Sequence, residues 1–587
     1  MPRVIATTTW FLLLYLACGV FQAHAQSQHV QPIQWSKYDG FGGVQPDDAF
    51  GQKLVGLIQK QSKFVMQEVQ DPANYREYDD YPENPGVPYY YAFEAGRGYE
   101  ASVRPLSNFA LGTAVMLKTE IYDPTAAGVS QDEALRRATL AINGAALSHR
   151  ANRLSGLRWG GGGQGSRTSD RWQAAYWAAQ TGWAAWMLWD QLPADSQRVV
   201  GNMVEYEANS FLNYNVPYWR NPDGSTNYSG DTKSEENSWN AMILSVAQAM
   251  MPGHPNAGQW REKASELQVS AYSVQGDNLP SGSGSQVVDG KPVHEWLSGY
   301  NMFSDGVLVN HRLVQPDYMI GASTLHFSTA IQASLAGQQI PNSTFFNAAI
   351  VYQALTEHNF IAGQSASPYS SGTFNDPGGT IFRRTGSGAE AIYSAQVYYP
   401  QGEDWVQTEA QIILEGHLNF DLYAEMLGLD AGKDYDAMGW ADARADRLLE
   451  MQARSAGAGN IYQPGDWVVD YFSQEQSIFM SITEAWLQHW LIRNGRMSPI
   501  GENWGPLQDS DAVGDFNRDG SVDAADYVLW RAGLGTSHTP AGYGIWRSNF
   551  GTQSSGGAVF AVPEPTSLTF LGLLMPVFAR DFRRIER

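Results

Sequence analysis

A short segment at residues 310–319, NHRLVQPDYM, concentrates side chains that exchange protons or bind anions. Asn310, His311, Arg312 and Tyr318 lie within nine residues. The guanidinium of Arg matches the shape of a carboxylate, and a nearby positive charge favours the phenolate form of Tyr. The segment is therefore a candidate active site.

A second segment, GDTKSEENSWNA at 230–241, has features of a helix start. Asp231 and Ser234 are candidate N-caps, and the acidic residues at 235 and 236 suit a first turn. This structural explanation does not cover Asn237, Trp239 and Asn240. Amides beside a Trp at a helix start are suited to meet a sugar.

A third segment, PVHEWLSGYNMFSDG at 292–306, adds His294, Tyr300 and Asn301. No cluster of His, Cys and Asp has zinc spacing, and no Gly-x-Ser-x-Gly elbow is present.

Together, DTKSEENSWNA and NHRLVQPDYM resemble motifs of the (α/α)-toroid uronate-polysaccharide lyases, most closely the alginate and glucuronan lyases of polysaccharide lyase family 38. The resemblance covers roughly residues 40 to 500 and depends on these two motifs. It implies Tyr318 as base and acid, Arg312 assisting it, and Asn237 neutralising the substrate carboxylate. His294 and His311 would have supporting roles, and Tyr300 is the reserve candidate for the base. The residues expected to bind substrate are Trp239, Asn240, Tyr300, Asn310, Arg167 and Arg171.

The expected reaction removes the C5 proton of a uronate, beside its carboxylate. That proton is too weakly acidic until donors neutralise the carboxylate and stabilise the developing negative charge. Asn, His and Arg are suitable donors, and one Tyr can take the C5 proton and then protonate the C4 leaving oxygen. No cofactor is expected for this step.

Two other functions remain open. A glycoside hydrolase needs two carboxyl groups, which Asp231, Glu235 or Glu236 could form with Asp305 or Asp317. A non-catalytic surface protein could instead bind carbohydrate through Trp-rich surfaces.

Helical patterns dominate residues 26–505, the expected catalytic domain. Trp172, Tyr176, Trp183 and Trp186 recur at helical spacing on one predicted face. Stacked helical hairpins favour a mainly α fold, an (α/α) toroid of six or seven hairpins, with a two-domain all-α protein as the alternative. The predicted helices are 104–121, 132–148, 195–212, 238–250, 258–273, 318–336, 343–358, 406–426, 438–455 and 473–493, and the best strand is 391–399.

A glycine run, RWGGGGQGSRTSDRW at 158–172, lacks the ending of a phosphate-binding loop. We expect a mobile loop at the rim of a cleft, with Arg167 and Arg171 able to reach a substrate.

The segment GDFNRDGSVDAAD at 514–526 has the spacing of an EF-hand calcium loop, with Asp at position 12 where Glu is usual. It resembles the loop of dockerin modules and predicts a calcium-binding α module at 510–553. ADYVLWRAGLGT (525–536) matches AGYGIWRSNFGT (541–552), but only the first has a loop, which argues against a cohesin partner. The predicted ligands are Asp515, Asn517, Asp519, Ser521, Asp523 and Asp526.

The two ends of the sequence resemble targeting segments. Residues 1–25 have the pattern of a secretory signal peptide. Residues 562–587 contain Pro-Glu-Pro, a short apolar run and four Arg, and resemble a PEP-CTERM sorting signal processed by an exosortase. We therefore expect a secreted or cell-surface bacterial protein.

The net charge of −22 excludes an overall attraction for nucleic acid, and no basic stripe is visible. An anionic polysaccharide would need a local cluster of Arg and His to overcome this background. The 20 Trp and 29 Tyr suit a protein that stacks rings against sugars.

Overall fold

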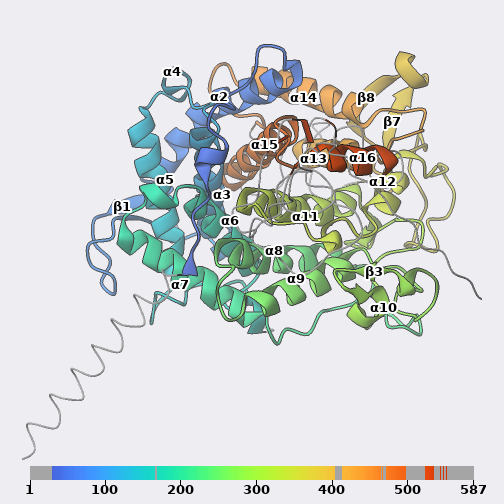
Figure 1. The fold of residues 1–587 in the computed structure, drawn as a ribbon, viewed down its shortest axis with the longest axis horizontal. Helices are drawn as coiled ribbons and strands as arrows, with labels where there is room; N and C mark the ends of the chain where they lie inside the picture. The colour runs from blue at the N-terminus through green and yellow to red at the C-terminus, as the bar shows by residue number, and fades with distance from the viewer. Residues whose placement is uncertain are drawn as a thin grey trace, which may run out of the picture.

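The structure is a computed structural model of the chain. It describes residues 29–94, 96–164, 168–402, 413–463, 466, 471–497, 522–533, 543, 546–547 and 550–551. Helices dominate these residues (Figure 1), which confirms the predicted mainly α class.

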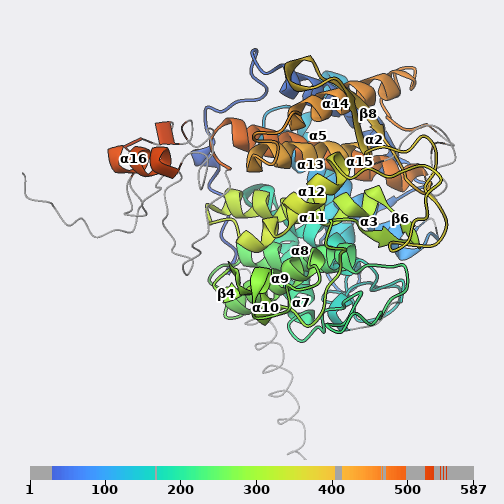
Figure 2. The same ribbon diagram turned by 90° about the vertical axis from the view of Figure 1, so that its right-hand side faces the viewer.

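Six helices contact one another in a closed cycle, in which each packs against the next and the last packs against the first. Figure 2 shows several of them side by side at the centre of the molecule. In order, they are α3 (Tyr99–Lys118), α6 (Ala174–Met187), α8 (Ser234–Met250), α11 (Pro316–Ala336), α13 (Leu414–Leu427) and α15 (Tyr471–Arg493).

A second set of helices packs against members of this cycle. α2 contacts α15, α5 contacts α3 and α6, α7 contacts α6 and α8, and α9 contacts α8. α12 contacts α11 and α13, and α14 contacts α13. Their bounds are α2 (Ala49–Gln70), α5 (Gln131–Ser148), α7 (Ala194–Ser210), α9 (Ala257–Ala271), α12 (Ala348–Thr356) and α14 (Ala437–Ala453).

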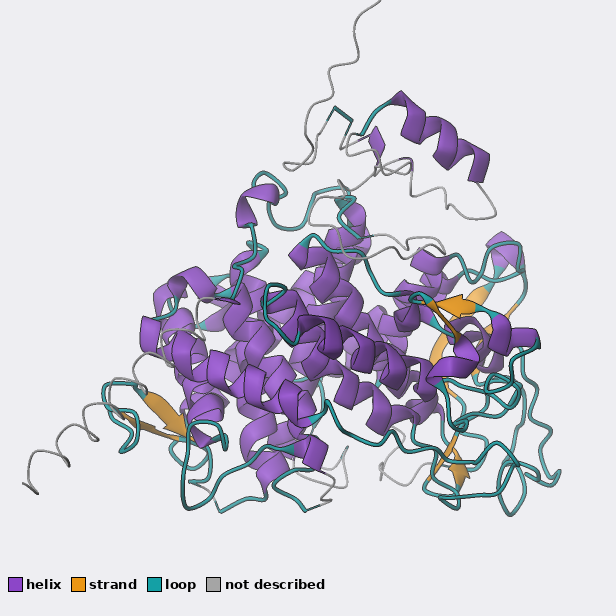
Figure 3. Cartoon of the chain, turned by 60° about the horizontal axis from the view of Figure 1, so that its bottom comes forward, coloured by secondary structure: helices purple, strands orange, loops and turns teal. Residues whose placement is uncertain are grey.

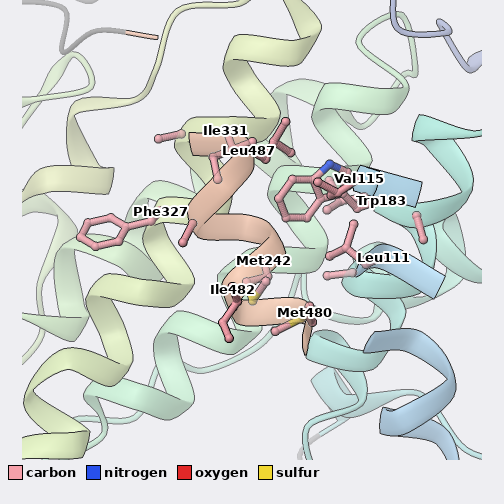
Figure 4. Close-up of a cluster of buried hydrophobic side chains, with 14 of the residues drawn as sticks. Leu111, Val115, Trp183, Met242, Phe327, Ile331, Met480, Ile482 and Leu487 are labelled. Atoms are coloured by element: carbon pink, nitrogen blue, oxygen red, sulfur yellow. The ribbon is translucent and has the colours of Figure 1, made fainter. Parts of the chain in front are cut away.

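Large apolar side chains from the central helices meet in a common core (Figure 4). Leu111 of α3, Trp183 of α6, Met242 of α8, Phe327 of α11 and Leu487 of α15 are all buried. Burying each such side chain contributes roughly 1.5–3 kcal/mol. The core therefore joins helices that are far apart in the sequence.

Helix α6 corrects the prediction of a single apolar face. Trp177 and nearly every other residue of this helix are buried, because α3, α5, α7 and α8 surround it. Trp172 lies before the helix begins at Ala174.

The helix start at α8 also differs from the prediction. α8 begins at Ser234 and its N-cap residue is Lys233, with no side-chain cap. The Ser234 hydroxyl donates to Ala271 O at 2.6 Å, and Asp231 pairs with Lys233. The N-cap prediction is therefore wrong, whereas the acidic first turn is confirmed.

Short antiparallel hairpins occupy the connections, as Figure 3 shows in orange. β7 and β8 confirm the strand predicted at 391–399. The pairs are β1 (Arg76–Tyr78) with β2 (Tyr89–Tyr91), β3 (Val287–Val288) with β4 (Lys291–Pro292), β5 (Val309–Asn310) with β6 (Leu313–Val314), and β7 (Phe382–Thr385) with β8 (Ile392–Val397).

The remaining helices are short, except for α16 near the C-terminus. None of the helices in the described ranges has the length and apolar character needed to cross a membrane. They are α4 (Pro124–Ala127), α10 (Val293–Trp296), α16 (Ala524–Gly533), and the 3-10 turns η2 (Trp35–Lys37), η3 (Gly162–Gln164), η4 (Trp189–Gln191), η5 (Gly282–Ser285), η6 (Asn342–Phe345) and η7 (Gly388–Glu390).

Candidate functional site

The first half of NHRLVQPDYM forms a tight hairpin. Strands β5 and β6 pair Asn310 with Leu313, so His311 and Arg312 alone make the turn. Their φ angles are 50° and 67°. Two-residue hairpin turns with positive φ at both positions normally use Asn-Gly, because side chains with a Cβ strain the backbone there. Non-glycine residues in this conformation strain the backbone, and such strain clusters at functional sites.

Neighbouring backbone groups hold the turn in place. Arg312 N donates to Gly230 O at 2.9 Å, and Thr232 N donates to Val309 O at 3.0 Å. A Cβ on Gly230 would lie 2.6 Å from Arg312 Cγ, so the Arg312 side chain passes directly over this glycine. The segment before α8 therefore supports the hairpin before α11.

Tyr318 lies in the first turn of α11, facing the hairpin. Pro316 is at the start of this helix, where its missing N–H removes no helical hydrogen bond. The Tyr318 hydroxyl is 3.3 Å from His311 Nε2, and the side chain is 8% exposed. His311 and Arg312 are exposed. The structure thus brings together three of the predicted catalytic residues on one side of the first turn of α11.

A neighbouring polar cluster was not predicted from the sequence. Asp317 Oδ1 lies 3.0 Å from both the Tyr399 hydroxyl and His417 Nε2. Burial holds the pKa of His417 well below its usual range, so its ring is neutral and donates to Asp317. Tyr399 follows β8 and His417 is on α13, so no local pattern relates them to Tyr318.

Asn237 lies in the interior of the fold. It is fully buried, and its side-chain amide donates to Pro217 O at 3.0 Å and Ser270 Oγ at 2.8 Å. The predicted neighbour Asn301 is also buried and donates to Ser270 O at 2.8 Å. Both amides hold the 217–219 segment against α8 and α9.

Three other predicted residues lie together in a cavity of about 410 Å³. Trp239 and Asn240 from α8 line it with Arg171. Trp172 also lines the cavity, and its ring contacts that of Trp239 edge-to-face at 5.1 Å. An aromatic pair beside an amide and a guanidinium is a lining that suits a sugar.

One acidic residue at the start of α8 borders this cavity, and two others lie near it in the chain. Glu236 lines it and pairs with buried Lys233 at 3.1 Å, and Lys233 also binds Asp231 at 2.5 Å. Burial, chiefly, raises the pKa of Glu235 to about 8. The charges of Glu236 and Asp231 act in the same direction, and Arg104 opposes them. Glu235 is therefore protonated at neutral pH.

The amino-terminal turns of α8, α11 and α13 lie close together. A Cβ on Gly321 of α11 would lie 3.8 Å from Glu235 Cγ of α8. Asp317 of α11 is hydrogen-bonded to His417 of α13 at 3.0 Å. Tyr318, on α11, thus lies on the helix next to the one that lines the cavity.

The remaining predicted site residues either bond to neighbouring backbone groups or lie outside the described residues. His294 is on α10, and its Nδ1 lies 2.8 Å from Gly284 O. Tyr300 is 4% exposed, and its backbone pairs with Arg220. The Asn310 side chain accepts from His311 N at 2.8 Å. Arg167 lies outside the described residues.

The glycine run is anchored where it is described. Glu207 of α7 accepts from Gly161 N at 2.5 Å and Gly162 N at 2.8 Å, and it pairs with buried His149 at 3.0 Å. Gly162, Gly163 and Gln164 line the cavity, which places this part of the run at the rim. Side chains of α7 thus accept hydrogen bonds from the backbone of residues 161–163.

The predicted calcium loop is described only at its end. Asp515, Asn517, Asp519 and Ser521 lie outside the described residues. Asp526 is buried and accepts from Asp523 N at 2.7 Å.

The aromatic residues of the two repeats pack together beside this end. The rings of Tyr527 and Trp546 are 4.9 Å apart, and those of Trp530 and Tyr543 are 5.5 Å apart.

A different acidic group is present within the part of the chain that the structure describes. Carboxylate oxygens of Glu425, Asp430 and Asp436 lie close enough together to hold a metal ion. Asp430 accepts from Ala437 N and Asp436 accepts from Met438 N, so two of the three also stabilise the start of α14.

The predicted targeting segments at 1–25 and 562–587 lie outside the described residues. No protein-family model matches the chain, and comparison with the curated proteins and with the solved structures gave no match.

Proposed function

We propose that the chain is a polysaccharide lyase that cleaves a uronate-containing polysaccharide of the alginate or glucuronan type by β-elimination. The observation that carries this proposal is the Tyr318 hydroxyl 3.3 Å from His311 Nε2, next to Arg312 in the same strained turn. A proton-exchanging hydroxyl, an imidazole and a guanidinium at one exposed edge are the groups that this reaction needs.

The fold that we propose for this domain is an (α/α)6 toroid. The closed cycle would form the inner ring, and α2, α5, α7, α9, α12 and α14 would form the outer ring. Each of the first five inner helices is followed, among the longer helices, by the outer helix that packs against it, and α2 packs against α15, which makes six helix pairs. The amino-terminal ends of the inner helices would then surround the active site.

In the proposed reaction, Arg312 binds the uronate carboxylate and stabilises the negative charge that develops when C5 loses its proton. Tyr318 takes that proton, with His311 accepting the phenolic proton beforehand. The C4–O bond then breaks as the C4–C5 double bond forms, and Tyr318 protonates the leaving oxygen. Asn237 acts indirectly in this scheme, because its amide is engaged in the interior.

The product of the reaction tests the proposal. Purified full-length protein is incubated with alginate, glucuronan and neutral glycans, and the ultraviolet absorbance of the unsaturated uronate is followed. We expect Tyr318→Phe to reduce kcat at least 100-fold, since it removes the hydroxyl that transfers the proton. Tyr122→Phe, which removes a hydroxyl bonded to Val129 O away from the site, serves as the matched control. Full activity in Tyr318→Phe would rule out this residue as the base.

A glycoside hydrolase is the second candidate, and the raised pKa of Glu235 favours it. A carboxyl group protonated at pH 7 can act as general acid, and Asp231 would be the second carboxylate. This enzyme would release reducing ends without ultraviolet absorbance. Glu235→Gln would then abolish activity while Tyr318→Phe retained it.

The two terminal segments and the calcium-binding module would have roles outside catalysis. Residues 1–25 would direct export from a bacterial cell, and residues 562–587 would be recognised by an exosortase. The 510–553 module would bind Ca²⁺ as a stabilised spacer near the C-terminus. No metal or organic cofactor takes part in the proposed β-elimination.

A further inference from the structure

Three adjoining cavities form one groove beside the candidate site. The cavity of about 410 Å³ shares Gln164 with a second of about 450 Å³ along α7. It shares Tyr214 and Tyr228 with a third of about 650 Å³ that extends toward α9. The three cavities therefore adjoin one another and extend along α7 and toward α9, which suits a chain of several sugar units.

Amides and aromatic rings line the whole groove. Amides both donate and accept hydrogen bonds, as sugar hydroxyls do, and rings pack against the apolar faces of sugars. The amides are Gln164, Gln173, Asn202, Asn209, Asn213, Asn215, Asn221, Asn227 and Asn240, and the rings are Trp172, Tyr206, Tyr214, Tyr218, Tyr228 and Trp239.

The charges of the groove do not favour an anionic chain. The described lining has two cations, Arg171 and Lys263, and three carboxylates, Glu205, Glu236 and Glu266. Lys263 is already paired with Glu266 at 2.6 Å. The cavity along α7 has Glu205 and no cation in its described lining. Because Glu236 is paired with Lys233 as well, the groove offers a polyuronate no excess of positive charge.

We propose that this groove binds uncharged sugar units next to the cleavage point. The natural substrate is then a mixed polysaccharide, in which neutral sugars adjoin the uronate at Tyr318. This inference rests on the proposed lyase function and replaces its alginate- or glucuronan-type substrate, in which every unit is a uronate, with a mixed chain.

Binding to an inactive variant tests the groove independently of the reaction. Full-length Tyr318→Phe is titrated calorimetrically with neutral hexasaccharides of xylose, mannose or glucose and with hexauronates, at low and high salt. We expect at least one neutral hexasaccharide to bind with an affinity that salt leaves unchanged, because no ion pairs form. Hexauronates should bind at least tenfold more weakly at low salt. Tighter binding of hexauronates, or no binding of any neutral hexasaccharide, would overturn the inference.

Substitutions of residues that line the groove test whether the neutral hexasaccharides bind there. Tyr206→Ala in the cavity along α7 should weaken neutral hexasaccharide binding at least fivefold. Asn213→Ala, at an exposed position in the central cavity, should weaken it without affecting folding. Tyr122→Ala, outside the groove, is the control. Unchanged affinity in both groove variants would place the binding elsewhere and refute the groove.

Activity of the wild type distinguishes the two proposals. We expect kcat/KM on a polymer that combines uronate and neutral units to exceed that on homopolymeric uronates at least tenfold. Equal or higher kcat/KM on homopolymers would refute the mixed substrate but leave the lyase intact. Neutral binding without unsaturated products from any polymer would instead refute the lyase and leave the groove as a glycan-binding site.

Discussion

His311 and Arg312 occupy backbone conformations that cost free energy. Both have positive φ in a turn that Asn-Gly would fill without strain. Each such non-glycine residue costs on the order of 1 kcal/mol or more. A protein keeps this strain where the side chains are needed, and here they lie beside the Tyr318 hydroxyl.

Removing this strain should raise the stability of the protein and abolish its activity. The double variant His311→Asn with Arg312→Gly should raise the free energy of unfolding by about 1–2 kcal/mol, as measured by chemical denaturation. Lyase activity should fall to background, because the imidazole and guanidinium are lost. A double variant that lost stability would show that the two side chains support the fold instead.

Between elements, close contacts in the cycle fix how its helices pack. A Cβ on Gly112 of α3 would lie 2.5 Å from the ring of Phe479 on α15. This contact closes the cycle, since α15 and α3 are its last and first members. Glycine at this position lets two helices from opposite ends of the domain approach closely.

Gly112→Ala should therefore destabilise the protein by about 1–3 kcal/mol through overpacking. Gly56→Ala is the matched control, because a Cβ there meets nothing within 4 Å on α2. The control should stabilise the helix by up to about 1 kcal/mol. Thermal unfolding of both variants measures the difference, and equal melting temperatures would contradict the close contact.

The calcium-binding module proposed at 510–553 leads to a separate prediction at the level of elements. Isothermal titration of the full chain with Ca²⁺ should show binding that Asp519→Asn or Asp526→Asn abolishes, since each removes a charged ligand. Asp436→Asn in the other acidic group is the control and should leave binding unchanged. Loss of binding in the control alone would move the calcium site to that group.

Across the whole molecule, three buried glutamates, together with Glu235 of α8, give the stability a pH dependence. Burial raises the pKa of Glu415 and Glu484 to about 8 and that of Glu475 to about 7. All three are less than 9% exposed. In the unfolded chain these groups release their protons near pH 4.5, so they favour the folded state below that pH and lose this effect as the pH rises toward 8.

The unfolding free energy should accordingly fall between pH 6.5 and pH 8. Each glutamate that keeps its proton only in the folded chain contributes about 1.4 kcal/mol per pH unit. Buried His326, whose pKa burial lowers to about 3, affects only the range below 6.5. Chemical denaturation across this window measures the slope, and Glu415→Gln should reduce it. A rising or flat profile would contradict the buried protonated carboxyls.

The mainly α class could be predicted from the sequence because helical periodicity is a local property. Most predicted helices match observed ones within a few residues, as 132–148 matches α5. α2 was missed from the sequence, and α12 is shorter than its prediction at 343–358 because 342–345 forms a separate turn.

The composition of the candidate site was also visible in the sequence, since Arg312, His311 and Tyr318 are close in the chain. Asn237 was predicted beside them, but its contacts with Pro217 and Ser270 depend on the packing of α8 against α9. Asp317 and its partners Tyr399 and His417 join segments about 80 to 100 residues apart.

By itself, the sequence determined the helical class and the chemical groups of one short segment, because both depend on neighbours in the chain. Only the tertiary structure decided which of those groups meet, because whether a side chain on a helix is exposed or buried depends on what packs against that helix. The closed cycle of helices and the groove along α7 and α9 arise from contacts between distant segments, which no local pattern encodes.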